Sequence, residues 1–159
     1  MAIKLTSLGG TDWGEEALKP TDLRDTINES LVQIYSDNTG GSHSGDTTET
    51  DLATITITQN DLNSNATIVV NAGILQNATT GSGSTTGTYR LKVGGTTQKT
   101  ITLSTADTEF AKSGTSFVYS QTAVDCTAGN VIVKITGQLS GNTGNAANCV
   151  GLTVLGYNR

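Results

Sequence analysis

The sequence is poor in the side chains on which many enzymes and helical proteins depend. Its 159 residues include one histidine, one proline, one tryptophan and two cysteines, and aromatic residues make up 4%. Charged residues make up only 14%, against roughly 25% in an average soluble protein. The single histidine, His43, lies in a Gly/Ser stretch, which disfavours histidine-based catalysis and histidine metal sites. We therefore expect no catalytic residue, no metal site and no cofactor.

Three classes of partner or location are disfavoured in the same way. The chain has no cluster of Lys and Arg that could neutralise phosphates, so we expect no nucleic-acid partner. No segment approaches the roughly 18 consecutive apolar residues of a membrane helix, so we expect no membrane insertion. The first residues lack the apolar core of a signal peptide. The sequence thus predicts a protein made in a cytoplasm and not exported by the usual route.

Small uncharged polar residues dominate what is present. The chain has 29 threonines, 13 serines, 12 asparagines and 19 glycines, a composition typical of β-structure with many turns. Apolar residues alternate with polar ones, which predicts strands at 53–57, 66–72, 89–93, 101–103, 117–119, 131–135 and 150–154, with an eighth candidate at 109–111. Short strands at this spacing predict a mainly β fold, a jelly-roll-like antiparallel β-sandwich over residues 51–159.

The N-terminal third differs from the rest of the chain in net charge and in the spacing of its apolar residues. Residues 1–50 hold three basic and nine acidic side chains, a net charge of −6, whereas residues 51–159 have a net charge of +1. An extended arm is predicted first, and Thr21 is placed to cap a short α-helix that ends near Ser36. We divide the chain into residues 1–36 (arm and helix for anchoring and oligomerisation), 37–50 (Gly/Ser linker) and 51–159 (β-sandwich). The residues expected to serve as anchor or oligomer contacts are Ile3, Leu5, Trp13, Leu23, Ile27, Leu31 and Ile34.

Several predicted strands are also apolar on their second face, at Val69, Val118, Ile132 and Leu155. A sandwich exposed to water on its outer faces would favour polar residues there. We expect another subunit to bury part of this surface, although scattered surface valines need no explanation.

The remaining polar candidates are expected to be structural. Cys126 and Cys149 fall at opposite ends of the predicted sandwich, which favours two free thiols over a disulfide. The acidic residues near strand ends are expected to serve turns, and ordinary solvation is expected for the basic residues Arg90, Lys92 and Lys99. The loops at 79–87 and 139–148 are the natural recognition tips. The acidic residues in question are Asp51, Asp61, Asp107, Glu109 and Asp125.

Residues 10–28, GTDWGEEALKPTDLRDTIN, resemble a leader seen in bacteriophage fibre and virion-surface proteins. Such leaders have a Trp, here Trp13, a Gly-Glu-x-Leu step, and an Asp-Leu-Asn-Asp-Thr-x-Asn opening of a short helix. Here the step ends in Glu16-Ala17-Leu18, and Arg24 stands where Asn is usual. The resemblance implies an arm that anchors to the particle, helices that bundle on a threefold axis, and jelly rolls that project outward.

Three hypotheses follow. The first is a structural virion protein, a small homotrimeric fibre or capsid-decoration protein whose partners are its own copies and other virion proteins, with loop tips that could contact host glycans. The second is a carbohydrate-binding β-sandwich module, which predicts a monomer with an exposed aromatic platform. The third is a jelly-roll enzyme, which would need a histidine cluster or paired carboxylates in a cleft. We favour the first, with no enzyme activity and a location in the virion.

Overall fold

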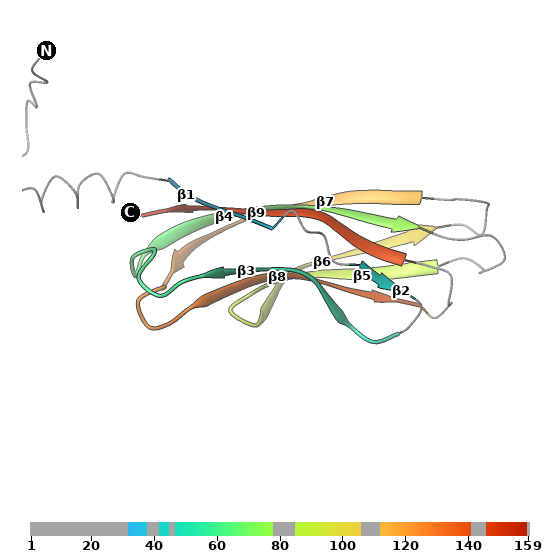
Figure 1. Cartoon of the computed structure of the whole chain (residues 1–159), viewed down its shortest axis with the longest axis horizontal. Helices are drawn as coiled ribbons and strands as arrows, with labels where there is room; N and C mark the ends of the chain where they lie inside the picture. Colours follow the sequence, from blue (N-terminus) through green and yellow to red (C-terminus); the bar gives the residue numbers. More distant parts are fainter. Residues whose placement is uncertain are drawn as a thin grey trace, which may run out of the picture.

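The computed structural model describes residues 32–37, 42–44, 47–77, 85–105, 112–140 and 146–158 (Figure 1). Within these ranges the chain forms β-strands only, and none of it is a helix long and apolar enough to cross a membrane. The strands are β1 (Val32–Asp37), β2 (Ser42–Ser44), β3 (Thr50–Ile57), β4 (Ala66–Asn77), β5 (Thr85–Val93), β6 (Thr96–Thr105), β7 (Lys112–Val124), β8 (Val131–Leu139) and β9 (Ala146–Tyr157).

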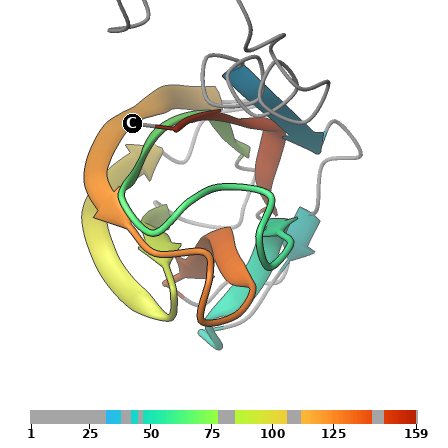
Figure 2. The same cartoon turned by 90° about the vertical axis from the view of Figure 1, so that its left-hand side faces the viewer.

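The strands form two antiparallel sheets. The first sheet has the order β1-β9-β4-β7, and β2 pairs with β9 next to the residues that pair with β1. The second sheet has the order β3-β8-β5-β6. Figure 1 shows the two sheets stacked, and Figure 2 shows them curving around a common interior. This interleaved strand order is that of a jelly-roll β-sandwich, so the predicted fold class is confirmed.

Strand β4 shows how the sequence pattern builds the core. Ile68, Val70, Ala72 and Ile74 alternate along it and are buried between the sheets. The intervening residues face away from the core because successive side chains of a strand point to opposite faces. Both sheets contribute to the interior, and its largest fully buried apolar or aromatic side chains include Leu52, Ile57, Leu62, Tyr89, Leu91, Phe117, Ile135, Leu139 and Leu152.

Hydrogen bonds close the two long sides of the sandwich. Where β6 lies beside β7, Tyr119 Oη donates to Gln98 Oε1 at 2.9 Å and Ser113 Oγ donates to the Ser104 carbonyl at 3.1 Å. On the other side, the backbone N–H of Thr54 donates to Asp37 Oδ2 at 3.4 Å. The sheet edges on each side therefore partner each other across the sandwich, which limits how far they are open to pairing with another chain.

A polar network crosses the interior between the sheets. Gln76 on β4 is fully buried, and its Oε1 accepts a hydrogen bond from Tyr89 Oη at 2.9 Å. Its Nε2 donates to the Thr85 carbonyl at 3.0 Å and to Thr105 Oγ1 at 2.8 Å. Every polar end of the Gln76 side chain is thus bonded, as burial requires.

The seven principal predicted strands are confirmed, each inside one of β3 to β9. The eighth candidate, residues 109–111, lies outside the described residues. The jelly roll is completed instead by β1, which precedes the predicted sandwich domain.

The predicted end of the N-terminal helix is wrong. Residues 32–37 form β1, and all six pair with β9, from Val32 opposite Tyr157 to Asp37 opposite Leu152. The helix therefore cannot run to Ser36, and the sandwich includes β1 from Val32 rather than beginning at residue 51. The physical reason is that the pairing satisfies the backbone of β1 and lets Tyr35 pack against the core. The predicted linker also contains a strand, β2, in which His43 lies opposite Ala147.

Candidate functional site

The two outer faces of the sandwich differ in charge. The outer face of the second sheet carries an ion-pair cluster centred on Glu49, the residue before β3. Glu49 Oε1 lies 2.7 Å from Lys92 Nζ, Glu49 Oε2 lies 3.4 Å from Arg90 Nη1, and the Thr136 hydroxyl donates to the same carboxylate. These hydrogen bonds, that from Lys92 first, hold the pKa of the Glu49 carboxyl below its usual value.

The basic residues of the second sheet, for which ordinary solvation was predicted, are mostly ion-paired. Arg90 and Lys92 lie on the same face, and Glu49 of the same chain pairs with both. Lys134 is paired in the same way with Asp51 at 2.8 Å. Lys99 lies apart from them, with its Nζ 3.4 Å from the Val118 carbonyl. The basic residues on the second sheet thus do not form an open surface for a polyanion.

The outer face of the first sheet carries no charged residue among those whose side chains the structure describes. Hydroxyl, amide and apolar groups cover it. We call it the uncharged face and define it by the outward residues of four strands, which are Ile34 and Ser36 of β1, Asn148, Val150, Thr153 and Leu155 of β9, Val69, Asn71, Gly73 and Leu75 of β4, and Ser116, Val118 and Ser120 of β7.

The uncharged face gathers most of the exposed large apolar side chains that the structure describes. Ile34 is 70% exposed, and Val118 and Val150 are each 61% exposed. Val69 and Leu155, half-buried, are register partners in the row that also contains Ile34. Three of the four second-face residues singled out from the sequence therefore belong to this face, whereas Ile132 lies on the second sheet.

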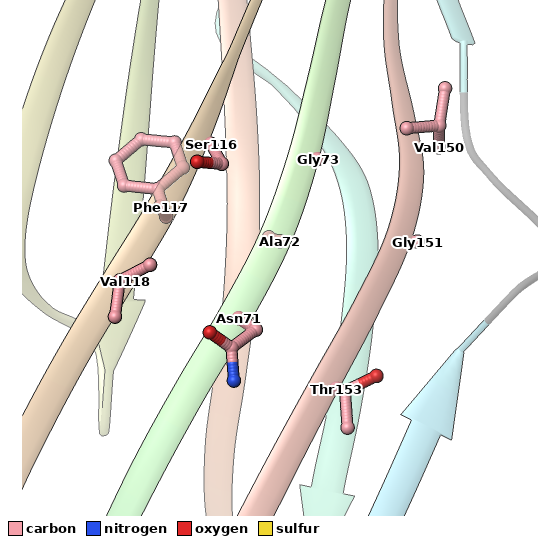
Figure 3. Close-up of a pocket in the computed structure, with 9 residues that line it drawn as sticks. All are labelled: Asn71, Ala72, Gly73, Ser116, Phe117, Val118, Val150, Gly151 and Thr153. Carbon is pink, nitrogen blue, oxygen red and sulfur yellow. The ribbon is translucent and has the colours of Figure 1, made fainter.

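An open groove crosses the middle of this face (Figure 3). Its floor is low because Gly73 on β4 and its register partner Gly151 on β9 both lack side chains. A β-bulge next to this pair leaves Val150 without a register partner on β4, and its Cγ2 lies 2.7 Å from the position a Cβ at Gly73 would take. Val118 on β7 forms the opposite wall, and the groove has a volume of about 380 Å³.

The groove is lined by apolar groups and by uncharged hydrogen-bonding groups. Asn71, Ser116 and Thr153 supply an amide and two hydroxyls from three neighbouring strands. Its lining contains no carboxylate, histidine, cysteine or lysine, the groups from which acid–base and nucleophilic sites are usually built. Elsewhere in the described part of the chain, no three His, Cys, Asp or Glu side chains gather to hold a metal ion.

Of the predicted turn acids that the structure describes, Asp61 and Asp125 accept hydrogen bonds from nearby turn residues. The prediction is wrong for Asp51, which lies within β3 and pairs with Lys134 of β8. Asp125 accepts hydrogen bonds from the Thr127 hydroxyl and backbone N–H at 2.7 and 2.8 Å. Asp61 accepts from the Thr58 N–H at 3.3 Å and from Tyr35 Oη at 3.4 Å. Burial first, and then the Asp61 carboxylate, raise the pKa of the Tyr35 hydroxyl to about 12. Residues Asp107 and Glu109 lie outside the described residues.

Both cysteines are free and buried, as predicted. Cys126 lies in the connection between β7 and β8, and Cys149 lies within β9. Burial is the main cause that raises the pKa of each thiol. Little thiolate forms at neutral pH, so neither cysteine is a candidate nucleophile.

Of the predicted anchor residues, the structure places Ile34 on the uncharged face. The others lie outside the described residues; they are Ile3, Leu5, Trp13, Leu23, Ile27 and Leu31. The predicted recognition loops are described only at their flanks, where Thr85, Leu139 and Ala146 belong to strands. Sequence reasoning missed the groove, because Gly73 and Gly151 meet only through the pairing of β4 with β9.

Neither a protein-family model nor a curated protein sequence matches the chain. Solved structures are similar in fold. A chain in the structure of infectious bursal disease virus, Gx strain, has 15% identity and a TM-score of 0.48, with 82% of this chain and 33% of that chain covered. The EclA C-terminal domain, described as a sugar-binding protein, has 13% identity and a TM-score of 0.46, with 97% and 99% covered.

A third similar structure is dimeric latent PorU from Porphyromonas gingivalis, with 14% identity and a TM-score of 0.47. The match covers 82% of this chain but only 13% of PorU. The chain thus spans about a third of the viral protein and a much smaller part of PorU. At these identities the likeness concerns the fold alone.

Proposed function

We propose that this chain is a structural virion protein, a small homotrimeric fibre or capsid-decoration protein anchored by its N-terminal arm, with the β-sandwich projecting outward. The observation that carries the proposal is the uncharged face. Three of the four large apolar side chains that the structure describes as exposed lie on this one face, and such a concentration on a soluble domain marks a surface that another molecule covers. The bacteriophage part of the proposal rests on the leader resemblance in residues 10–28.

The position of β1 fits an anchored sandwich. Within the described residues, β1 pairs with β9 alone and is therefore an edge strand of the first sheet. An arm attached at a sheet edge leaves the second sheet and its ion-pair cluster free to face solvent. In this proposal the chain has no catalytic role, and its partners are its own copies and other virion proteins.

The proposal is tested on the full chain and on intact particles. Native mass spectrometry at micromolar concentration should give a trimer, and antibodies raised against the chain should label the surface of phage particles from its source. A monomer that labels no particle would overturn the proposal.

The carbohydrate-binding alternative makes the opposite predictions. It requires a monomer and an exposed aromatic platform for sugar stacking. Among the described tyrosines, Tyr89 is fully buried, while Tyr35 and Tyr119 are half-buried and donate hydrogen bonds to Asp61 and Gln98. Tyr157 is half-buried at the end of β9. Specific, saturable glycan binding by a monomer would favour this alternative over the virion protein.

A further inference from the structure

We propose that a second copy of this chain packs on the uncharged face, and that Val118 and Val150 lie at the centre of this contact. The proposal rests on the proposed homotrimer, in which the uncharged face of each copy would turn toward the threefold axis and contact both neighbouring copies. Three properties of the uncharged face support the proposal: its charge, its size and its surface shape.

The charge of the face limits what can cover it. Lys99 of β6 reaches the β7 edge of the face, where its Nζ lies 3.4 Å from the Val118 carbonyl. A charged group of a partner would lose its hydration over the middle of this face, where no described outward side chain carries a charge, and burying an unpaired charge is costly. The occupant must therefore present an uncharged surface. The chain itself has one, because its described ion pairs lie on the second sheet, at Glu49 with Arg90 and Lys92 and at Asp51 with Lys134.

The residues before β1 satisfy this requirement less well. Residues 1–31 hold six acidic and three basic side chains, a net charge of −3. Packing between copies of the sandwich keeps such charges out of the contact. A second copy is therefore favoured over the chain's own N-terminal segment.

The size of the face matches a stable subunit contact. Four strands lie side by side and β4 is 12 residues long, which gives a plane of about 19 by 40 Å, or about 750 Å². Specific protein–protein interfaces bury about 800 Å² on each partner. One face of this sheet can thus supply nearly a full interface.

The shape of the face and the placement of its polar groups resemble the centre of a protein–protein interface. The groove over Gly73 lies between Val118 and Val150, near the middle of the sheet. Asn71 and Ser116 lie beside the apolar walls and supply groups that can hydrogen-bond. Interfaces commonly combine a buried apolar centre with a polar rim.

The experiment introduces one charge at the proposed centre and one at a matched control position. Val118→Lys and Val150→Lys are made in the full chain, with Ile132→Lys as the control because Ile132 is an exposed strand residue of the other sheet, 40% exposed. Oligomeric state is measured by native mass spectrometry and sedimentation velocity, and folding by circular dichroism and urea unfolding. Both valines are largely exposed, so each variant should fold.

We expect wild type and Ile132→Lys to be oligomers, and both valine variants to dissociate at least about tenfold more readily, because each buries an unpaired ammonium group. Val150→Lys serves as a second variant should Val118→Lys not fold. If both valine variants assemble like wild type, the uncharged face is covered by something else and this inference fails while the proposed function stands. If wild type itself is a monomer, both fail.

Discussion

At the scale of single residues, the clearest constraint lies around Gln76. Its amide joins β4 of the first sheet to β5 and β6 of the second through three hydrogen bonds. Gly87 on β5 lies against this amide, and a Cβ at Gly87 would overlap Gln76 Oε1 and come within 2.8 Å of the Tyr89 ring. The glycine is needed here for space and not for an unusual backbone angle.

Gly87→Ala should therefore lower the free energy of unfolding by about 3 kcal/mol, since the added methyl group overpacks the core and displaces buried hydrogen bonds. The measurement is urea unfolding of the purified variant. Gly129→Ala is the matched control, because no atom lies within 4 Å of its added Cβ and its φ is not positive. Equal stabilities of the two variants would contradict the proposed packing at Gly87.

The ionisation of the Glu49 carboxyl should affect the free energy of unfolding. The folded state lowers its carboxyl pKa from 4.5, mainly through the hydrogen bonds from Lys92 and Thr136. A lowered folded pKa adds stability above the unfolded value, and this stability is lost as the pH falls through the folded pKa. The lowered pKa of Glu49 therefore predicts that the folded protein becomes less stable in acid.

Glu49→Gln removes this titration. The difference in unfolding free energy between wild type and Glu49→Gln should be largest near about pH 6 and shrink on going to about pH 3. Urea unfolding at both pH values measures it. A difference that stays constant with pH would show that the Glu49 ion pairs do not contribute to stability.

At the scale of the elements, β1 shows where sequence periodicity is ambiguous. Ile34 follows Leu31 by three residues, which fits a helix, but Val32 and Ile34 also alternate, which fits a strand. The partner decides between these patterns, since β9 pairs with all six residues of β1. That partner lies more than 100 residues away in the sequence, so local pattern alone did not resolve the choice.

The strands from β3 to β9 were predictable because their alternation of apolar and polar residues is visible in the local sequence. In β4, the alternation of Ile68, Val70, Ala72 and Ile74 is a local signal that burial between two sheets confirms. The candidate site was predictable only in part. Val118 and Leu155 were visible as apolar residues on a second face, but the groove depends on Gly73 meeting Gly151 across a bulge, which is a property of register.

The assignment of β1 can be tested by cross-linking. Ser36 and Thr153 are register partners, and paired antiparallel residues lie about 4.5–5.5 Å apart at Cα, within the range of a disulfide. The double variant Ser36→Cys/Thr153→Cys should oxidise readily, and the unfolded, unreduced protein should show only the thiols of Cys126 and Cys149.

The control is Ser36→Cys/Tyr157→Cys, which is four residues out of register and leaves the Cα atoms too far apart, at about 13 Å. It should keep all its thiols free. Cross-linking of both pairs, or of neither, would contradict the register of β1 with β9.

At the scale of the whole molecule, residues 32–159 contain every described strand of the sandwich, so a truncation to these residues should keep its cooperative thermal unfolding. A truncation to 51–159 removes β1 and β2, exposes the edge of β9 and removes the half-buried Tyr35. It should be less stable by about 2 kcal/mol, because it loses the partial burial of Tyr35 together with the hydrogen bonds between β1 and β9. Circular dichroism melting curves compare them, and equal melting temperatures would place the boundary at residue 51 after all.

The pairing of β1 with β9 also determines how the molecule responds to mechanical force. Val32 lies opposite Tyr157, so the chain enters the sandwich beside the place where its last strand ends. The hydrogen bonds between antiparallel strands run perpendicular to the strands. Tension along β1 would therefore load all six register pairs at once in shear, whereas tension across the sheet would break them one after another from Val32. A sandwich pulled by its N-terminal arm is strong along its strands and weak across them.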